Sequence, residues 1–182
     1  MSAGGTMRRA AGLGLALLAA GCAAPSVRTT APGMAPVAVQ PATARDDAAP
    51  ALAAIRRAAG HGALRRDDRL DAAARGHALY MQRSGRMGHD GQGGSGPMER
   101  VRGQGLLACF AAENVAEGYG DLPRVLRAWM ASPGHRANIL DPRATLFGMA
   151  RAGDYWTMLT AAPCPQGAVL SPTDGAVILP RR

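Results

Sequence analysis

The sequence has no lysine, only three cysteines, and few aromatic residues (two Phe, two Trp and three Tyr). All of its basic residues are therefore arginines, and these are scattered along the chain rather than clustered. Nucleic-acid-binding domains usually gather their basic residues on one face and supply aromatic side chains that stack on bases. The composition therefore argues against nucleic acid as a partner. Beyond residue 22, no apolar run is long enough to span a bilayer.

The first 22 residues have the layout of an export signal. Arg8 and Arg9 form a short positive patch, residues 10–20 form an uncharged run rich in Ala and Leu, and small residues close the segment at Cys22. Such a run is too short for a stable membrane span and is typical of a secretory signal peptide. We therefore expect the protein to function outside the cytoplasm, in the cell envelope.

The end of this segment resembles the lipobox of bacterial lipoproteins. The resemblance implies that a lipid is attached to Cys22, which becomes the mature N-terminus and anchors the protein to a membrane. Ala19 stands where lipoboxes usually carry Leu, Val or Ile, so an ordinary signal peptide that releases a soluble periplasmic or secreted protein is the alternative. Ala23 is not the Asp that often retains lipoproteins at an inner membrane. In a Gram-negative cell we therefore expect the periplasmic face of the outer membrane.

The rest of the chain divides into three parts. Residues 23–49 are rich in Pro and Ala and predict a disordered linker. Residues 50–162 are long enough for one domain with a hydrophobic core, which we expect to be a monomer, and residues 163–182 form a Pro- and Gly-rich tail. Loss of Arg8 and Arg9 with the signal lowers the formal net charge from +8 to +6. This charge suits anionic envelope polymers or lipid headgroups, and it is equally consistent with a solvated surface.

Two cysteines, Cys109 and Cys164, remain after the signal. Outside the cytoplasm a pair of cysteines is more often bridged than free, so we predict a disulfide between them, with two buried thiols as the alternative. The bridge would close a loop of more than fifty residues. In the chain-entropy model such a bridge stabilises a fold by about 4 kcal/mol.

Apolar periodicity predicts helices early in the domain and strands late in it. The helical segments are residues 51–59, 70–81, a turn at 98–103, and a helix that starts after Asp121 and ends at 132–134, with an irregular loop over 84–98. The strands are residues 145–151 and 155–161, which form a hairpin. Helices followed by paired strands indicate the α+β class.

Two of the four histidines, His89 and His135, lie beside glycine in expected loops, where glycine permits tight turns and open access. Glu113 is the third candidate, because it interrupts an apolar run and a buried carboxylate needs a partner. His77 lies on the apolar face of its helix and is expected to be a core histidine. His61, in a Gly-flanked turn, is expected to be a surface or capping residue.

The residues His89, Glu113 and His135 could bind a divalent metal such as zinc with one coordination position left open. They could equally form a hydrogen-bonded network that orders a cleft without any chemistry. The sequence has no H-E-x-x-H zinc motif and no Gly-x-Ser-x-Gly elbow, and neither Ser132 nor Cys109 has the setting of a catalytic nucleophile.

Several short motifs within residues 50–162 fit one family in their order and spacing. They are Leu70-x-x-x-Ala74-x-x-His77, Gly88-His89, Glu99-Arg100, Ala112-Glu113-Asn114-Val115-Ala116, Trp129-Met130-x-Ser132-Pro133-Gly134-His135-Arg136-x-Asn138-Ile139-Leu140, Phe147-Gly148-Met149-Ala150 and Tyr155-Trp156-Thr157. The chain resembles the bacterial branch of the CAP superfamily (cysteine-rich secretory proteins, antigen 5 and pathogenesis-related proteins). The resemblance implies a three-layer α-β-α sandwich with a central cleft.

In eukaryotic members of this superfamily the cleft holds two His and two Glu, and the resemblance assigns His89 and Glu113 to two of these four positions. Ser132 replaces the second Glu and Tyr155 replaces the second His. The resemblance implies that His135, typical of the bacterial branch, fills the vacated space.

Five further motif residues are given supporting roles by the same resemblance. Arg100, Asn114 and Arg136 are expected to hold the loops of the cleft. Trp129 and Trp156 are expected to be core residues, although Trp156 could line the cleft.

The function that the resemblance implies is binding. We expect a tethered domain whose cleft recognises a lipid, a glycan or a peptide of the envelope. One alternative is a metal-assisted hydrolase of envelope peptides or glycans, in which His89 and His135 hold the ion and Glu113 serves as ligand or base. A structural lipoprotein without a ligand is the other.

Overall fold

The computed structural model of this chain describes residues 47–171 and 177–179. The export signal predicted for residues 1–22 lies outside the described residues, as does the linker except for its last residues, so both stay predictions. Among the described helices, none is long and apolar enough to cross a membrane.

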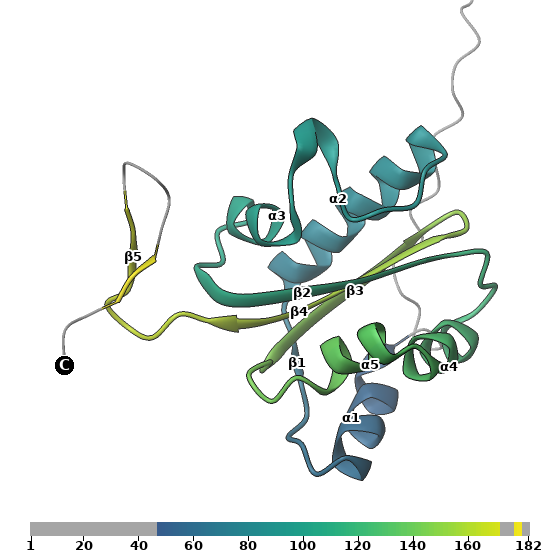
Figure 1. Cartoon of the computed structure of the whole chain (residues 1–182), viewed down its shortest axis with the longest axis horizontal. Helices are drawn as coiled ribbons and strands as arrows, with labels where there is room; N and C mark the ends of the chain where they lie inside the picture. Colours follow the sequence, from purple (N-terminus) through teal and green to yellow (C-terminus); the bar gives the residue numbers. More distant parts are fainter. Residues whose placement is uncertain (1–46, 172–176, 180–182) are drawn as a thin grey trace, which may run out of the picture. The chain divides into compact units, whose positions relative to one another are not determined.

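The centre of the domain is a four-stranded sheet with the strand order β1-β3-β4-β2 (Figure 1). β1 is parallel to β3, and the other pairs are antiparallel. The strands are β1 (Arg65–Arg66), β2 (Ala108–Glu117), β3 (Leu146–Ala152) and β4 (Tyr155–Pro163). β2 is therefore a long strand at the edge of the sheet, a position that leaves backbone N–H and C=O groups to be covered by other parts of the chain.

Helices cover both faces of this sheet. One face carries α2 (Asp68–Ser84) and α3 (Pro97–Gly103), and the other carries α1 (Ala48–Ala58), α4 (Leu122–Ala131) and α5 (Pro133–Leu140). Because strand side chains alternate between faces, each strand contributes to two cores. Leu146 of β3 packs in the core under α2 and α3, whereas Phe147 and Met149 pack in the core under the other three helices. The predicted α-β-α sandwich is thereby confirmed.

The backbone of α2 lies very close to the sheet at Gly148. A Cβ atom there would lie 2.2 Å from the carbonyl carbon of Leu70 and 2.3 Å from the backbone nitrogen of Asp71. The Asp71 carboxylate accepts a hydrogen bond from the Met149 backbone nitrogen at 2.8 Å. Because Gly148 has no side chain, α2 can pack directly against β3. This contact helps to position α2, the helix that carries His77.

Sequence periodicity predicted most of the helices but missed other elements. The predicted N-cap Asp121 is confirmed, since its carboxylate accepts a hydrogen bond from the Arg124 backbone nitrogen at 2.8 Å. The predicted hairpin is confirmed as β3 and β4. β2 and α5 were not predicted, and residues 92–94 of the expected loop form a short 3-10 helix. α1 begins at Ala48, two residues before the expected start of the domain.

The predicted disulfide is confirmed, and it links the segment after β4 to strand β2. Cys109 and Cys164 are bridged across a sequence separation of 55 residues, with Cα atoms 4.7 Å apart. β4 extends to Pro163, so the folded part reaches past the expected boundary at residue 162. In the tail, β5 (Val169–Leu170) and β6 (Val177–Ile178) form a two-stranded antiparallel pair.

Candidate functional site

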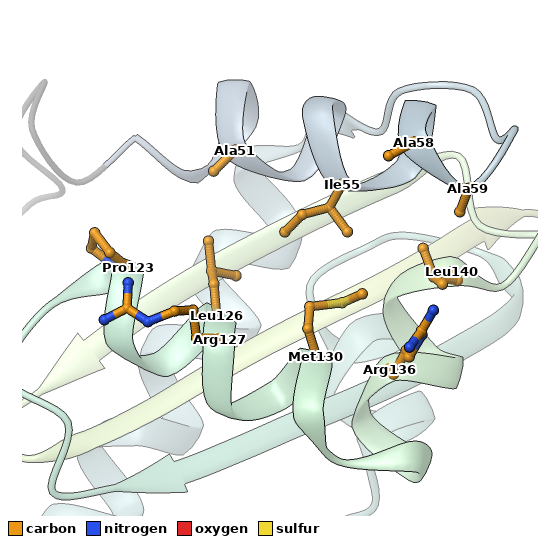
Figure 2. Close-up of a pocket in the computed structure, with 10 residues that line it drawn as sticks. All are labelled: Ala51, Ile55, Ala58, Ala59, Pro123, Leu126, Arg127, Met130, Arg136 and Leu140. Carbon is orange, nitrogen blue, oxygen red and sulfur yellow. The ribbon is translucent and has the colours of Figure 1, made fainter.

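An apolar cavity of about 570 Å³ lies between α1 and the α4–α5 pair (Figure 2). This volume falls in the usual range for small-ligand sites. Ala51 and Ile55 point into the cavity from α1, and Leu126, Met130 and Leu140 point into it from α4 and α5. Eight of its ten lining residues are apolar; the remaining two are Arg127 and Arg136, which are exposed. The sequence singled out Arg136 as a support for cleft loops, whereas the structure places it on this cavity.

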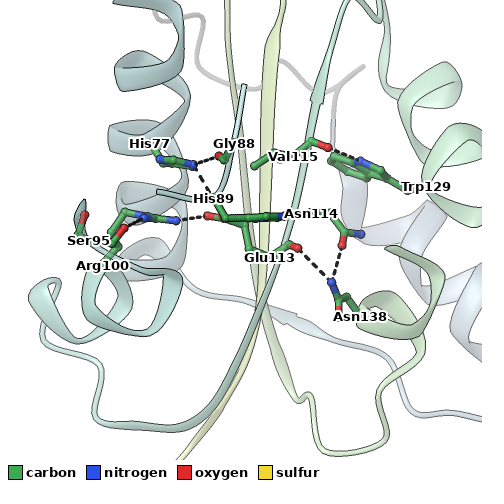
Figure 3. Close-up of polar contacts among 10 residues, drawn as sticks. All are labelled: His77, Gly88, His89, Ser95, Arg100, Glu113, Asn114, Val115, Trp129 and Asn138. Atoms are coloured by element: carbon green, nitrogen blue, oxygen red, sulfur yellow. Dashed lines mark hydrogen bonds and ion pairs between the residues drawn. The ribbon is translucent and has the colours of Figure 1, made fainter. Parts of the chain in front are cut away.

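A polar cluster lies on the other face of the sheet, around Glu113 of β2 (Figure 3). The Glu113 side chain is only 1% exposed. Its Oε1 atom lies 2.9 Å from Nδ1 of His89, and its Oε2 atom accepts a hydrogen bond from Arg100 at 2.7 Å. Nε2 of His77 lies 3.7 Å from Oε1. A buried carboxylate needs such partners, because an unpaired charge away from water is costly.

Each partner of Glu113 comes from a different element. His77 projects from α2, Arg100 from α3, and His89 from the loop between these helices. Arg100 also donates a hydrogen bond to the Ser95 carbonyl, and a Cβ at Gly91 would lie 2.8 Å from Nη1 of Arg100. The loop is therefore folded closely around the guanidinium, which explains a glycine at this position.

His77 is buried, as the sequence predicted for a core histidine. Its Nε2 atom lies 2.8 Å from the Gly88 carbonyl, which can only accept, so Nε2 carries the proton. Burial lowers the pKa of His77, and the nearby Arg100 and His89 lower it further, against the opposing effects of Glu113 and the Gly88 carbonyl. His77 was predicted only as a core residue, and its contact with Glu113 was not predicted. The signal for that contact was the place of His77 on the helix face that packs against the sheet.

Asn114 follows Glu113 but points to the opposite face of the sheet. Its side-chain amide donates to the His135 carbonyl at 3.0 Å. Asn138 donates to the Glu113 carbonyl at 3.0 Å and to the Asn114 side chain at 2.9 Å, and Trp129 Nε1 donates to the Val115 carbonyl at 3.2 Å. These α4 and α5 side chains satisfy carbonyls on the free side of edge strand β2. The motif residues Asn114, Trp129 and Asn138 are thus structural in this chain.

His135 lies in α5 and not in a loop, which corrects the sequence analysis. Its ring centroid is 6.4 Å from that of Trp129, and burial, with a smaller effect of His89, lowers the pKa of its imidazole. His89 does lie in a loop, and its side chain is 56% exposed. The structure thus brings His89 and Glu113 into direct contact, while His135 contributes its backbone carbonyl to Asn114 on the other face of β2.

These residues do not fit a metal centre of the predicted kind. Among residues 47–171 and 177–179, no group of three or more His, Cys, Asp or Glu side chains is placed to hold a metal ion. Both oxygens of Glu113 are already engaged, one by a guanidinium that would repel a cation. The other sequence-based hypothesis was a hydrogen-bonded network of His89, Glu113 and His135 that orders a cleft. The structure contains the His89–Glu113 contact of that network, but the other partners of Glu113 are Arg100 and His77 rather than His135.

Comparison with known proteins places this fold in a family. A model of the CAP (cysteine-rich secretory protein) family matches residues 51–159. The chain belongs to the CAP family. This confirms the resemblance seen in the motifs around His89, Glu113 and residues 129–140.

Individual CAP relatives cover parts of this chain. It is 32% identical over 96 residues to YkwD of Bacillus subtilis, an uncharacterised protein, and it spans 37% of the length of that relative. Among solved structures, an extracellular SCP-domain protein of Bacillus anthracis superposes with a TM-score of 0.59 at 24% identity, covering 61% of this chain and 37% of that one. An outer surface protein of Borrelia burgdorferi gives 0.58 at 23%, covering 63% and 88%. At these identities the two structures establish a shared fold.

Proposed function

We propose that this CAP domain binds a single-chain anionic amphiphile, with its acyl chain in the cavity between α1, α4 and α5. The observation that carries the proposal is an apolar cavity of about 570 Å³ with two exposed arginines among its lining residues. A lipid was one of the three ligand classes expected from the sequence.

The apolar walls favour an acyl chain over a glycan or a polar peptide. Ile55, Leu126, Met130 and Leu140 offer no hydrogen-bonding group, so sugar hydroxyls or peptide amides buried there would lose their bonds to water. An acyl chain gains roughly 0.8 kcal/mol for each methylene that it buries. A hydrophobic pocket of this size therefore favours an acyl chain over a sugar or a polar peptide.

The rim arginines favour an anionic headgroup. Arg127 and Arg136 are exposed, and neither side chain takes part in a hydrogen bond or ion pair within residues 47–171 and 177–179. A guanidinium can hold a carboxylate or phosphate through two parallel hydrogen bonds. An amphiphile in the cavity would place such a group within reach of the side chains at its mouth.

The predicted export and lipidation at Cys22 fit this proposal, because a lipid anchor and a linker would keep the domain beside a source of acyl chains. The metal-assisted hydrolase receives no comparable support. A general base needs a free lone pair within reach of its substrate, whereas Glu113 is 1% exposed and bonded at both oxygens.

The proposal is tested by titrating the mature chain with lysophosphatidylglycerol below its micelle concentration. Ala51→Phe, which fills the cavity from α1, should abolish saturable binding. The double variant Arg127→Glu, Arg136→Glu should weaken binding by roughly tenfold, equivalent to about 1.4 kcal/mol. The charge-matched control Arg83→Glu, Arg86→Glu changes exposed residues away from the cavity and should bind as the parent does. Equal affinity in all three variants would contradict the proposal, as would no binding by the parent.

A further inference from the structure

A second cavity, separate from the apolar one, lies between α2 and α3. Its volume is about 310 Å³, at the lower end of the range for small-ligand sites. Seven of its eleven lining residues have polar side chains, including Tyr80, Gln92, Glu99 and Gln104, and the small residues Ala72 and Gly76 leave room along α2. His77 and Arg100, which hold Glu113 from this side, also belong to its lining.

His77 presents an unused hydrogen-bond acceptor in this lining. Its Nε2 proton is committed to the Gly88 carbonyl, so the neutral ring has a bare Nδ1 atom. That atom is buried and has no hydrogen-bond partner in the described structure, and the whole side chain is 0% exposed. A buried polar atom without a partner calls for an explanation, such as a water or a ligand.

Arg100 presents an unused donor in the same lining. Its two terminal nitrogens bond to the Ser95 carbonyl and to Glu113, whereas its Nε–H is buried without a hydrogen-bond partner. The cavity lining therefore holds one unsatisfied acceptor and one unsatisfied donor. A hydroxyl group both donates and accepts, so hydroxyl-bearing molecules match this pair better than amines or carboxylates do.

The charges around the cavity select against an anion. The positive charge of Arg100 is already neutralised by Glu113, and Glu99 adds an exposed carboxylate to the lining. The one guanidinium of the lining is thus matched by two carboxylates, Glu113 beside the cavity and Glu99 within its lining, so an anionic ligand would find no unpaired positive charge among the described residues there. The Tyr80 ring and the small residues of α2 offer flat apolar surface to the carbon face of a ring.

We propose that the cavity between α2 and α3 binds one neutral, polyhydroxylated ring, that is, a single sugar unit, free or at the end of a glycan. The side chains of Gln92, Glu99 and Gln104 bond the outer hydroxyls, and a hydroxyl at the inner wall satisfies His77 and Arg100. This site is independent of the amphiphile cavity, which lies across the sheet, so either can fail without the other.

Gly76 provides the test, because a Cβ there would meet nothing within 4 Å and it lies in a helix interior. Gly76→Leu should fill the cavity while favouring the helix, and Gly76→Ala is the matched control that adds helix propensity but little bulk. We expect the mature chain to bind glucose and N-acetylglucosamine saturably in NMR titrations, with shifts in α2 and α3, and Gly76→Leu to weaken binding by at least about tenfold. If a chitin disaccharide binds more tightly than N-acetylglucosamine, the ligand is the end of a glycan. If the two bind with equal affinity, the ligand is a free sugar.

Three outcomes would overturn the sugar site. The first is that neither neutral sugar gives a saturable shift, which would mean that water alone satisfies His77 and Arg100. The second is that Gly76→Leu binds the sugars as tightly as Gly76→Ala does. The third is that glucuronate, the anionic counterpart, binds as tightly as glucose.

Discussion

Glu113 and Asn114 are neighbours on β2 but point to opposite faces of the sheet. The two faces differ in how their buried polar groups are bonded and in the kind of cavity that they enclose. Under α2 and α3, the buried Glu113 carboxylate is bonded to His89 and Arg100. Under α1, α4 and α5, Asn114 anchors α5, while an apolar cavity stays open further from the strand. The face under α2 and α3 contains a carboxylate with both oxygens hydrogen-bonded, whereas the face under α1, α4 and α5 has an apolar cavity lined in part by two arginine side chains without partners among the described residues.

The difference teaches which residues are available to a ligand. A carboxylate with both oxygens engaged stabilises the loops that meet at it, and removal of one member leaves a buried charge behind. An apolar cavity contributes no such hydrogen bonds, so substitutions in its lining are expected to change the stability of the fold only slightly. The cluster around Glu113 is therefore expected to serve stability, and the apolar cavity between α1, α4 and α5 to serve amphiphile binding.

The largest effect is expected for Glu113→Ala, which leaves the guanidinium of Arg100 buried without its counter-charge. We expect a loss of about 3–5 kcal/mol in the free energy of unfolding, measured by urea denaturation. Glu117→Ala, at the exposed end of the same strand, should cost under about 1 kcal/mol. Equal losses in the two variants would contradict the stabilising role of the Glu113 cluster.

Asn138→Ala should have the next largest effect, because it removes the donor to the Glu113 carbonyl and to the Asn114 side chain. We expect a loss of about 1–3 kcal/mol, the usual cost of leaving a buried acceptor unsatisfied. Urea denaturation measures it, and protection of β2 amides from hydrogen exchange should fall as well. Unchanged protection would show that α5 does not cover the edge strand.

A pH titration of stability sharpens the comparison on the polar face. The pKa of His77 is lowered below its ordinary value of 6.5 in the folded chain, so below that pH the unfolded chain binds the extra proton. Stability is therefore complete above about pH 6.5 and falls as the pH drops towards the folded-state pKa, by up to about 1.4 kcal/mol per pH unit. In His77→Gln this slope should be reduced, while the contribution of His135 stays. Identical slopes would contradict the assignment.

The smallest effect is expected on the opposite face, for Ala51→Leu, which places apolar bulk in existing apolar space. We expect the free energy of unfolding to change by less than about 1 kcal/mol, in either direction. Thermal denaturation checks this. A loss of 3 kcal/mol or more would mean that the space is needed by the fold and is not a free cavity.

The sequence could predict the parts of this fold that depend on local signals. The helix capped by Asp121, the β3–β4 hairpin and the Cys109–Cys164 bridge all follow from spacing or residue type. β2 was missed because Glu113 and Asn114 break its apolar run, and they do so since each serves a different face. α5 was missed because Pro133 and Gly134 are typical of a loop, although proline is well suited to the first turn of a helix.

Only the part of the candidate site that depends on local signals was predictable. The pairing of Glu113 with His89 followed from the cost of a buried carboxylate and from the family motifs. The contributions of His77 and Arg100, and the apolar cavity, depend on how α1, α2 and α3 pack on the sheet. Contacts between elements that are far apart in the sequence leave no local pattern, so single-sequence reasoning could not place His135 on the other face of β2.

The measurement that tests the account most directly is one binding experiment on three chains: the parent, Ala51→Phe and Glu113→Gln. Lysophosphatidylglycerol is titrated into each at a pH and temperature where circular dichroism shows all three folded. The account predicts saturable binding to the parent and to Glu113→Gln with similar affinity, and none to Ala51→Phe. Binding that survives in Ala51→Phe but is lost in Glu113→Gln would contradict the account and would place the ligand at the polar cluster around Glu113.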